Sequence, residues 1–313
     1  MKSIKEIYRI GNGPSSSHTM GPKRAAQLFL DKHHDADKFV ATLYGSLAAT
    51  GKGHLTDAAI LDVLSPAAMT TIEWQPNVFL PFHPNAVKFE SYNRAGDVTD
   101  SWTVYSIGGG TLSDGTKIIG LDEQRNRNIY DKNKITDILH WCKETGKTYW
   151  EYVEECEDSD IWDYLSHVWQ VMSAAVRRGL ESEGVLPGPL ALTRKASTYY
   201  IKAKGYKDSL QSRGLVFAYA LAVSEENASG GEIVTAPTCG SSGVIPAVLY
   251  HLHKSHEFTE KRILRSLATA GLFGNTVKAN ASISGAEVGC QGEIGVACAM
   301  AATAACQLFG GSP

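Results

Sequence analysis

The second half of the chain repeats apolar residues at the spacing of long amphipathic helices. Within residues 162–180 this spacing is carried by Leu165, Val168, Trp169, Met172 and Val176. Residues 214–223 and 263–272 predict two further apolar helices, and the alanine-rich stretch 294–308 predicts a fully buried one. This half of the chain is therefore expected to fold as a mostly helical domain.

The first half has a different pattern. Residues 39–44 predict a strand and residues 56–64 a helix, and short β-rich runs follow at 86–92, 101–107 and 117–120. Turn signals at 94–97 and 113–115 separate these runs. The fold class is thus an α+β N-terminal domain over residues 1–140 followed by a mostly α-helical catalytic domain over 155–313. We expect the linker between residues 126 and 160, and we read the acidic run 151–160 as a solvated face.

Composition restricts the function. At 313 residues the chain is long enough for two domains, and 43% hydrophobic with 20% charged residues is typical of a soluble protein. A net charge of −3 with no basic stripe argues against nucleic acid as a partner. We find no apolar run of membrane-spanning length and no signal peptide, so we expect a cytoplasmic protein with no membrane partner. Its six cysteines are then expected to be reduced thiols or metal ligands.

A cysteine in a glycine-rich setting, within residues 285–293, is the strongest single signal for chemistry. Cys290 lies close to glycines and between Glu287 and Glu293, and a thiolate there is a soft ligand for iron–sulfur or zinc. Glu287 and Glu293 could hold a substrate ammonium group or orient Cys290, or could serve only in helix capping. Cys298 and Cys306 follow at eight-residue steps, about 12 Å apart on a helix. That separation is too long for one compact cluster, so we interpret both as helix-packing residues.

An N-terminal loop, residues 13–22, carries four hydroxyls and a histidine between two Gly-Pro pairs. A helix is expected to begin near Pro22, since proline suits the first helical turn. Capping that helix needs one hydroxyl, whereas this loop offers Ser15, Ser16, Ser17, His18 and Thr19. We therefore expect the loop to bind an anionic group.

A third segment, residues 235–246, again places small residues, hydroxyls and prolines ahead of an apolar helix. Such a helix entry favours a carboxylate, although simple capping would produce the same pattern. From this segment and from residues 278–284 we take Thr238, Ser241, Asn280 and Ser282 as candidates for polar contacts to substrate.

In order and spacing, these three motifs resemble those of the bacterial iron–sulfur-dependent L-serine dehydratases, or L-serine ammonia-lyases. The similar segments are GPSSSHTMGP, TAPTCGSSGVIPAV and GAEVGCQGEIGVACAMAA. The resemblance implies a β-elimination of water from L-serine that gives pyruvate and ammonia, with a [4Fe-4S] cluster in place of pyridoxal phosphate. It also implies a beta-type first domain, a cluster-bearing alpha-type second domain, and a role in amino-acid catabolism or gluconeogenesis.

The resemblance assigns roles to particular residues. Cys290 matches a cluster ligand, and residues 15–19 match the loop expected to bind substrate. We expect catalytic roles for His18, Ser16, Ser17 and Thr19, with His18 or a hydroxyl of its loop transferring the proton, and a substrate-binding role for Ser15. The expected partner is the small molecule L-serine, and the expected assembly is a homodimer.

One departure and three alternatives accompany this prediction. Family members continue past residue 313 with further cluster cysteines, so we expect an alpha-type domain truncated at its C-terminus, with an uncertain activity. A related lyase acting on L-cysteine, or a non-catalytic amino-acid-binding form, would carry similar loops. A pyridoxal-phosphate lyase using Lys278 is less favoured, because no phosphate-binding loop on a strand accompanies that lysine.

Overall fold

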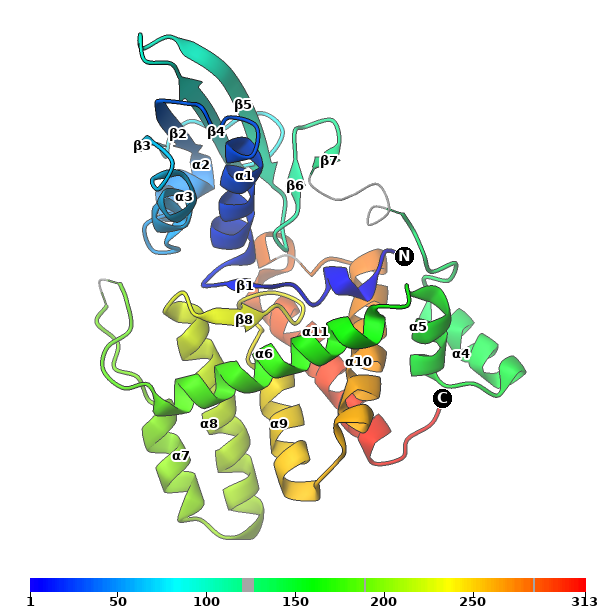
Figure 1. Cartoon of the computed structure of the whole chain (residues 1–313). Helices are drawn as coiled ribbons and strands as arrows, with labels where there is room; N and C mark the ends of the chain where they lie inside the picture. The colour runs from blue at the N-terminus through cyan, green and yellow to red at the C-terminus, as the bar shows by residue number, and fades with distance from the viewer. Residues whose placement is uncertain (120–126, 189, 284) are drawn as a thin grey trace. The chain divides into compact units, whose positions relative to one another are not determined.

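The structure, a computed structural model, describes residues 1–119, 127–188, 190–283 and 285–313 (Figure 1). The chain forms two compact units. One is Gly13–Asp122, and the other combines Met1–Asn12 with Glu123–Pro313. The first twelve residues therefore pack with the helical half of the chain and not with the α+β unit that follows them.

The α+β unit contains a six-stranded sheet with the order β3-β2-β4-β5-β6-β7 (Figure 1). The strands are β2 (Lys38–Tyr44), β3 (Met69–Gln75), β4 (Asn85–Tyr92), β5 (Val98–Ser106), β6 (Leu112–Ser113) and β7 (Ile118–Ile119). β2 and β3 are parallel because helices α2 (Gly45–Thr50) and α3 (Thr56–Leu64) connect them, and the other pairs are antiparallel.

The core of this unit forms where helix α1 (Gly21–Leu30) meets the sheet. Phe29 of α1 stacks on Phe89 of β4 with ring centroids 5.5 Å apart, and both rings are buried together with Phe39 of β2. The strands predicted at 39–44, 86–92 and 101–107 and the helix predicted at 56–64 are confirmed. Of the run predicted at 117–120, Ile118–Ile119 is a strand and residue 120 lies outside the described residues.

The second unit is helical apart from one small sheet. β1 (Ile10–Asn12) pairs antiparallel with β8 (Glu232–Val234), so that Ile10 lies opposite Val234. The helices are α4 (Ile135–Thr145), α5 (Tyr149–Cys156), α6 (Ile161–Glu181), α7 (Ala196–Lys204), α8 (Asp208–Ala228), α9 (Val244–His256), α10 (Glu260–Asn280) and α11 (Gly285–Leu308). The predicted α+β domain followed by a helical domain is confirmed.

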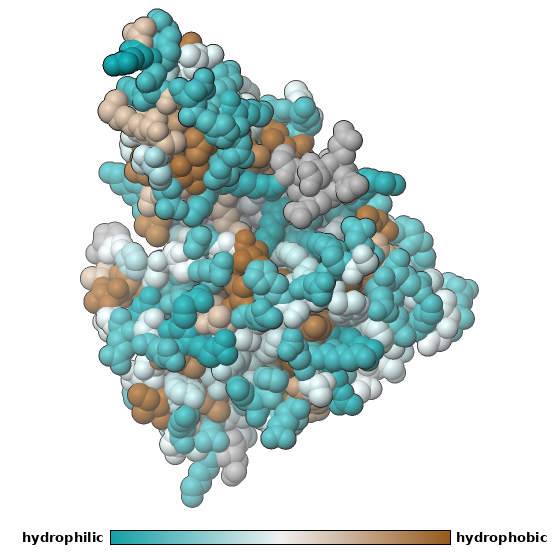
Figure 2. All heavy atoms as spheres, in the orientation of Figure 1, coloured by the Kyte–Doolittle hydropathy of each residue, from teal (hydrophilic) through white to brown (hydrophobic). Residues whose placement is uncertain are grey.

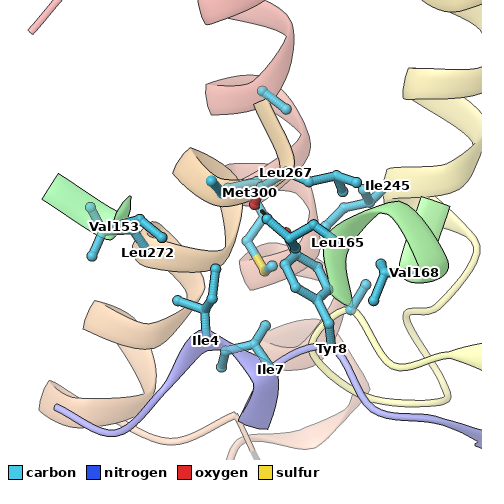
Figure 3. Packing of buried hydrophobic residues seen from close by; sticks show 14 of the residues in the cluster. Ile4, Ile7, Tyr8, Val153, Leu165, Val168, Ile245, Leu267, Leu272 and Met300 are labelled. Carbon is cyan, nitrogen blue, oxygen red and sulfur yellow. Dashed lines mark hydrogen bonds between the residues drawn. The ribbon is translucent and has the colours of Figure 1, made fainter. Parts of the chain in front are cut away.

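The N-terminal segment fills the core of the helical unit. Ile4, Ile7 and Tyr8 are fully buried and point toward Leu165 of α6 and Met300 of α11 (Figure 3). The Tyr8 hydroxyl donates to the carbonyl of Leu267 in α10 at 2.9 Å, which satisfies a polar atom inside this apolar cluster. This cluster explains why residues 1–12 belong to the helical unit.

The stretch expected to hold a linker, residues 126–160, contains α4 and α5. Ile138 and Cys142 of α4 and Val153 of α5 are buried in the main helical core. The bounds of the two predicted domains, 1–140 and 155–313, stay a prediction.

Figure 2 shows hydrophilic residues over most of the visible face, with hydrophobic residues in separate patches.

Helix α11 is not fully buried, so that prediction was wrong. Val296, Ala297, Met300, Ala301 and Ala304 are buried against neighbouring helices, but Ile294 is 40% exposed and Cys298 and Cys306 are exposed. Alanine, glycine and cysteine occur on every face of α11 itself, so its sequence does not reveal which face is buried. Because the side chains of Cys298 and Cys306 are exposed, the interpretation of both as helix-packing residues was wrong.

Helix α11 also contradicts the expectation that the chain has no apolar run of membrane-spanning length. Among the described residues, Val288–Leu308 is long and apolar enough by length and composition to cross a membrane, and 28% of its most apolar window is buried. A single helix of this kind is weak support for a membrane span, since core helices of soluble proteins have the same composition.

Candidate active site

The serine-rich loop forms a single π-helical turn, Ser16–Met20, immediately before α1. Ser15 caps this turn, because its hydroxyl accepts the backbone N–H of His18 at 3.1 Å. Helix α1 does contain proline at its start, as predicted, but its N-cap residue Met20 makes no side-chain cap. The hydroxyls therefore shape the π-helical turn and do not cap the following helix.

The turn fixes the imidazole of His18 through both ring nitrogens. Nδ1 lies 3.1 Å from the Ser17 hydroxyl, and Nε2 lies 3.1 Å from the hydroxyl of Ser46 at the start of α2. Burial, followed by the nearby rings of His54 and His83, lowers the pKa of His18 to about 4. His18 is therefore neutral at physiological pH and can both donate and accept hydrogen bonds.

His54 lies beside His18 and was not among the site residues predicted from the sequence. Its ring centroid lies 4.6 Å from that of His18, and its Nδ1 lies 3.0 Å from the carbonyl of Thr50. A carbonyl oxygen only accepts, so Nδ1 carries the proton and Nε2 of neutral His54 carries the lone pair. The one available signal was the glycine-flanked break at residues 51–54, which marks a polar loop between two helices.

Two threonines join the backbones of the paired histidines. The Thr19 hydroxyl donates to the carbonyl of His54, and the Thr56 hydroxyl donates to the carbonyl of His18, each at 2.6 Å. Thr19 is 3% exposed, so the structure gives it a positioning contact. Ser16 is also buried, whereas Ser15 and Ser17 are partly exposed beside His18.

Thr238 and Ser241 lie in the helical unit and are almost fully buried. Their hydroxyls are 3.1 Å apart, and Ser241 also donates to the carbonyl of Ala236 at 3.1 Å. Both side chains thus stabilise the loop between β8 and α9, and neither caps α9, whose N-cap residue Gly243 makes no side-chain cap. Their role as substrate contacts stays a prediction.

Asn280 ends α10 and donates from Nδ2 to the carbonyls of Asn133 and Thr276, at 2.5 and 2.8 Å. Ser282 follows it and is partly buried. Cys290 is exposed in α11, one turn before Glu293. A Cβ atom added to Gly240 would lie 3.2 Å from a Glu293 carboxylate oxygen, so the loop after β8 lies against this part of α11. The side chain of Glu287 lies outside the described part of the chain.

No group of three possible metal ligands occurs among the residues that the structure describes. Cys290 is accessible, but Cys239 is buried and Cys298 lies two helical turns further along α11. A [4Fe-4S] cluster needs three or four thiolates. The described residues therefore supply one candidate thiolate and do not complete a cluster site.

Lys278, the lysine considered for a Schiff base, is partly buried in the last turn of α10. Burial, and then the nearby charge of Arg9, lower its pKa to about 8, while Glu6 acts in the opposite direction. Arg9 is ion-paired with Glu6 beside it. Lys278 thus lies beside an ion pair, and we find no phosphate-binding loop around it within the described residues.

Comparison with known proteins gives the context for these residues. The family model of the serine dehydratase alpha chain matches residues 58–313, and that of the beta chain matches residues 3–75. This chain belongs to the serine dehydratase family. It is 37% identical to L-serine dehydratase 1 of Escherichia coli K12, with 100% of this chain and 80% of that protein covered.

Other relatives agree with this assignment. L-serine dehydratase of Haemophilus influenzae is 35% identical, with 100% of this chain and 80% of that protein covered. L-serine dehydratase of Streptomyces coelicolor is 36% identical, with 99% and 79% covered. The family resemblance drawn from the three sequence motifs is thereby confirmed. The similarity also extends over the entire helical unit.

Proposed function

We propose that this serine dehydratase is an L-serine ammonia-lyase that eliminates water from L-serine and yields pyruvate and ammonia. The observation that carries the proposal is the similarity, over the full chain, to relatives named L-serine dehydratase. Two family models, together spanning residues 3–313, support the same reaction class.

The reaction has two difficult steps, and the histidine pair suits the first. The α-hydrogen of serine is weakly acidic, so its removal needs a positioned base. His54 offers the Nε2 lone pair, and the Thr50 carbonyl at Nδ1 stabilises the imidazolium that forms. The neighbouring His18 stays neutral and so can orient the substrate through hydrogen bonds. We therefore place proton abstraction at His54 and substrate orientation at His18 and Ser17.

The second step expels the β-hydroxyl as water. Its loss leaves aminoacrylate, which tautomerises to an imine and hydrolyses to pyruvate and ammonia. The hydroxide that leaves the β-carbon takes up one proton to become water. This proton offsets the one that the base removes from the α-carbon, so the elimination consumes no net proton. Ser15 and Ser17 supply hydroxyls beside His18 for the polar groups of serine.

We propose a [4Fe-4S] cluster as the cofactor, as the family resemblance implies. A [4Fe-4S] cluster would supply a Lewis acid for the leaving hydroxyl, and Cys290 is the residue of this chain that would hold it. Because the described residues do not complete its ligand set, we assign no step of the reaction to the cluster. Cytoplasmic location, a homodimer and a role in amino-acid catabolism or gluconeogenesis belong to the proposal as well.

An anaerobic assay of the reconstituted chain tests this function. We expect L-serine to give pyruvate and ammonia in equal amounts, faster than L-cysteine gives pyruvate and sulfide. A preference for L-cysteine would favour the related lyase instead. Saturable binding of L-serine with no pyruvate at any iron loading would favour the amino-acid-binding form.

A further inference from the structure

A surface hollow in the helical unit lies apart from the residues discussed above. It has a volume of about 200 Å³ and lies between α6, α9 and the first turn of α10. Helix α6 lines it with Trp169, Ser173 and Arg177, which are four residues apart and so share one helix face. Helix α9 contributes Tyr250 and Lys254 with the same spacing.

Two cations at this hollow have no carboxylate partner among the described residues. Neither Arg177 nor Lys254 forms an ion pair with any residue that the structure describes, and Lys254 Nζ lies 5.7 Å from the Tyr250 ring centroid. Glu260 also lines the hollow and accepts a hydrogen bond from Ser166 at 3.1 Å. Two cations and one carboxylate leave the hollow net positive.

The floor contains an unused hydroxyl. Ser173 is 9% exposed and faces the hollow, and its hydroxyl has no hydrogen-bond partner in the described part of the chain. Because this hydroxyl faces the hollow beside Arg177, it can donate a hydrogen bond to a ligand bound there. Trp169 provides an apolar wall and packs edge-on against His253, whose Nδ1 lies 2.8 Å from the Phe258 carbonyl.

We propose that this hollow binds a small organic carboxylate. Arg177 and Lys254 would pair with the carboxylate, the Ser173 hydroxyl would donate to it, and the Trp169 ring would contact the carbon skeleton. A hollow of about 200 Å³ has room for a small carboxylate such as pyruvate. The proposal does not depend on the reaction proposed above.

The indole ¹⁵N resonance of Trp169, assigned with Trp169→Phe, reports binding at the hollow itself. We expect pyruvate to shift this resonance saturably at constant ionic strength, and at lower concentration than inorganic phosphate, which has no apolar part. Arg177→Gln and Ser173→Ala should each weaken the apparent affinity for pyruvate about tenfold. Lys261→Gln removes the same charge from an exposed position outside the hollow and should leave the affinity unchanged.

Cys290→Ser separates this site from the proposed active site, because it should leave the Trp169 response intact. Overturning results would be no saturable shift with pyruvate, a response to phosphate alone, or equal affinity in Arg177→Gln and the parent chain. A response that disappears in Cys290→Ser would place the carboxylate at the active site and would also overturn the proposal.

Discussion

At the scale of single residues, two histidines 4.6 Å apart have different surroundings and therefore different uses. His18 has a hydroxyl at each ring nitrogen, which holds the ring in place, and burial lowers its pKa so that it stays neutral. His54 has a carbonyl at Nδ1, which leaves the Nε2 lone pair for the base role proposed above. The sequence marked His18 through its unusual loop, while His54 and Ser46 become partners of His18 only after the chain has folded.

The low pKa of His18 predicts a pH-dependent stability. The folded-state pKa of about 4 lies below the ordinary value of 6.5, so the unfolded chain binds more protons between these values. The free energy of unfolding should fall as the pH drops from 6.5 toward 4, by about 2 kcal/mol from this residue. Urea unfolding across this range should show a shallower pH dependence for His18→Gln.

The matched control is His140→Gln, which changes an exposed histidine on α4. It should keep the pH dependence of the parent chain. If His18→Gln also keeps that dependence, His18 is not held neutral by its surroundings.

At the scale of elements, close helix packing depends on a few glycines. A Cβ atom on Gly179 of α6 would overlap the backbone carbonyl of Ala222 in α8. Backbone atoms cannot move aside as a flexible side chain can, so Gly179→Ala should destabilise the protein by about 1–3 kcal/mol. Thermal unfolding followed by circular dichroism at 222 nm measures this change.

Gly295 of α11 provides the control, because a Cβ atom there meets nothing within 4 Å. Gly295→Ala should stabilise the protein by up to about 1 kcal/mol through helix propensity. Destabilisation of the same size in both variants would contradict the proposed α6–α8 contact.

Secondary structure was predictable where side chains vary strongly in polarity. Helix α6 was predicted at 162–180 and spans Ile161–Glu181. The prediction succeeded because apolar residues recur at helical spacing along its buried face, with polar residues between them. The environment of α11 was not predictable, because small residues cover its whole circumference. The acidic run at 151–160 is exposed at most of its carboxylates, as expected, but Glu157 within it is buried. The sequence did not single out Glu157, since a charged residue reveals nothing of the donors that surround it.

At the scale of the whole molecule, a single carboxylate ties distant segments of the helical unit together. Glu157 is buried and accepts hydrogen bonds from the Ser3 hydroxyl, the Ile4 backbone N–H and the Tyr130 hydroxyl, at 2.6, 2.7 and 2.7 Å. These contacts fix the N-terminal segment, whose side chains fill the helical core. No sequence pattern shows that residues 1–12 belong to this unit.

Glu157→Ala would leave three donors without a partner, two of them largely buried. We expect a loss of about 3 kcal/mol in the free energy of unfolding, measured by urea denaturation. Glu155→Ala, two residues earlier, removes a half-exposed carboxylate paired with Lys147 and should change stability by less than about 1 kcal/mol. Equal losses in the two variants would show that the Glu157 contacts do not hold the N-terminal segment.

The central claim is that this serine dehydratase converts L-serine to pyruvate by proton abstraction at His54. The most direct measurement is kcat/KM for pyruvate formation by the anaerobically reconstituted chain and by His54→Asn. We expect an active parent chain and a loss of at least about 100-fold in the variant, with a melting temperature close to that of the parent. A parent chain that forms no pyruvate, or a variant with unchanged kcat/KM, would contradict the account.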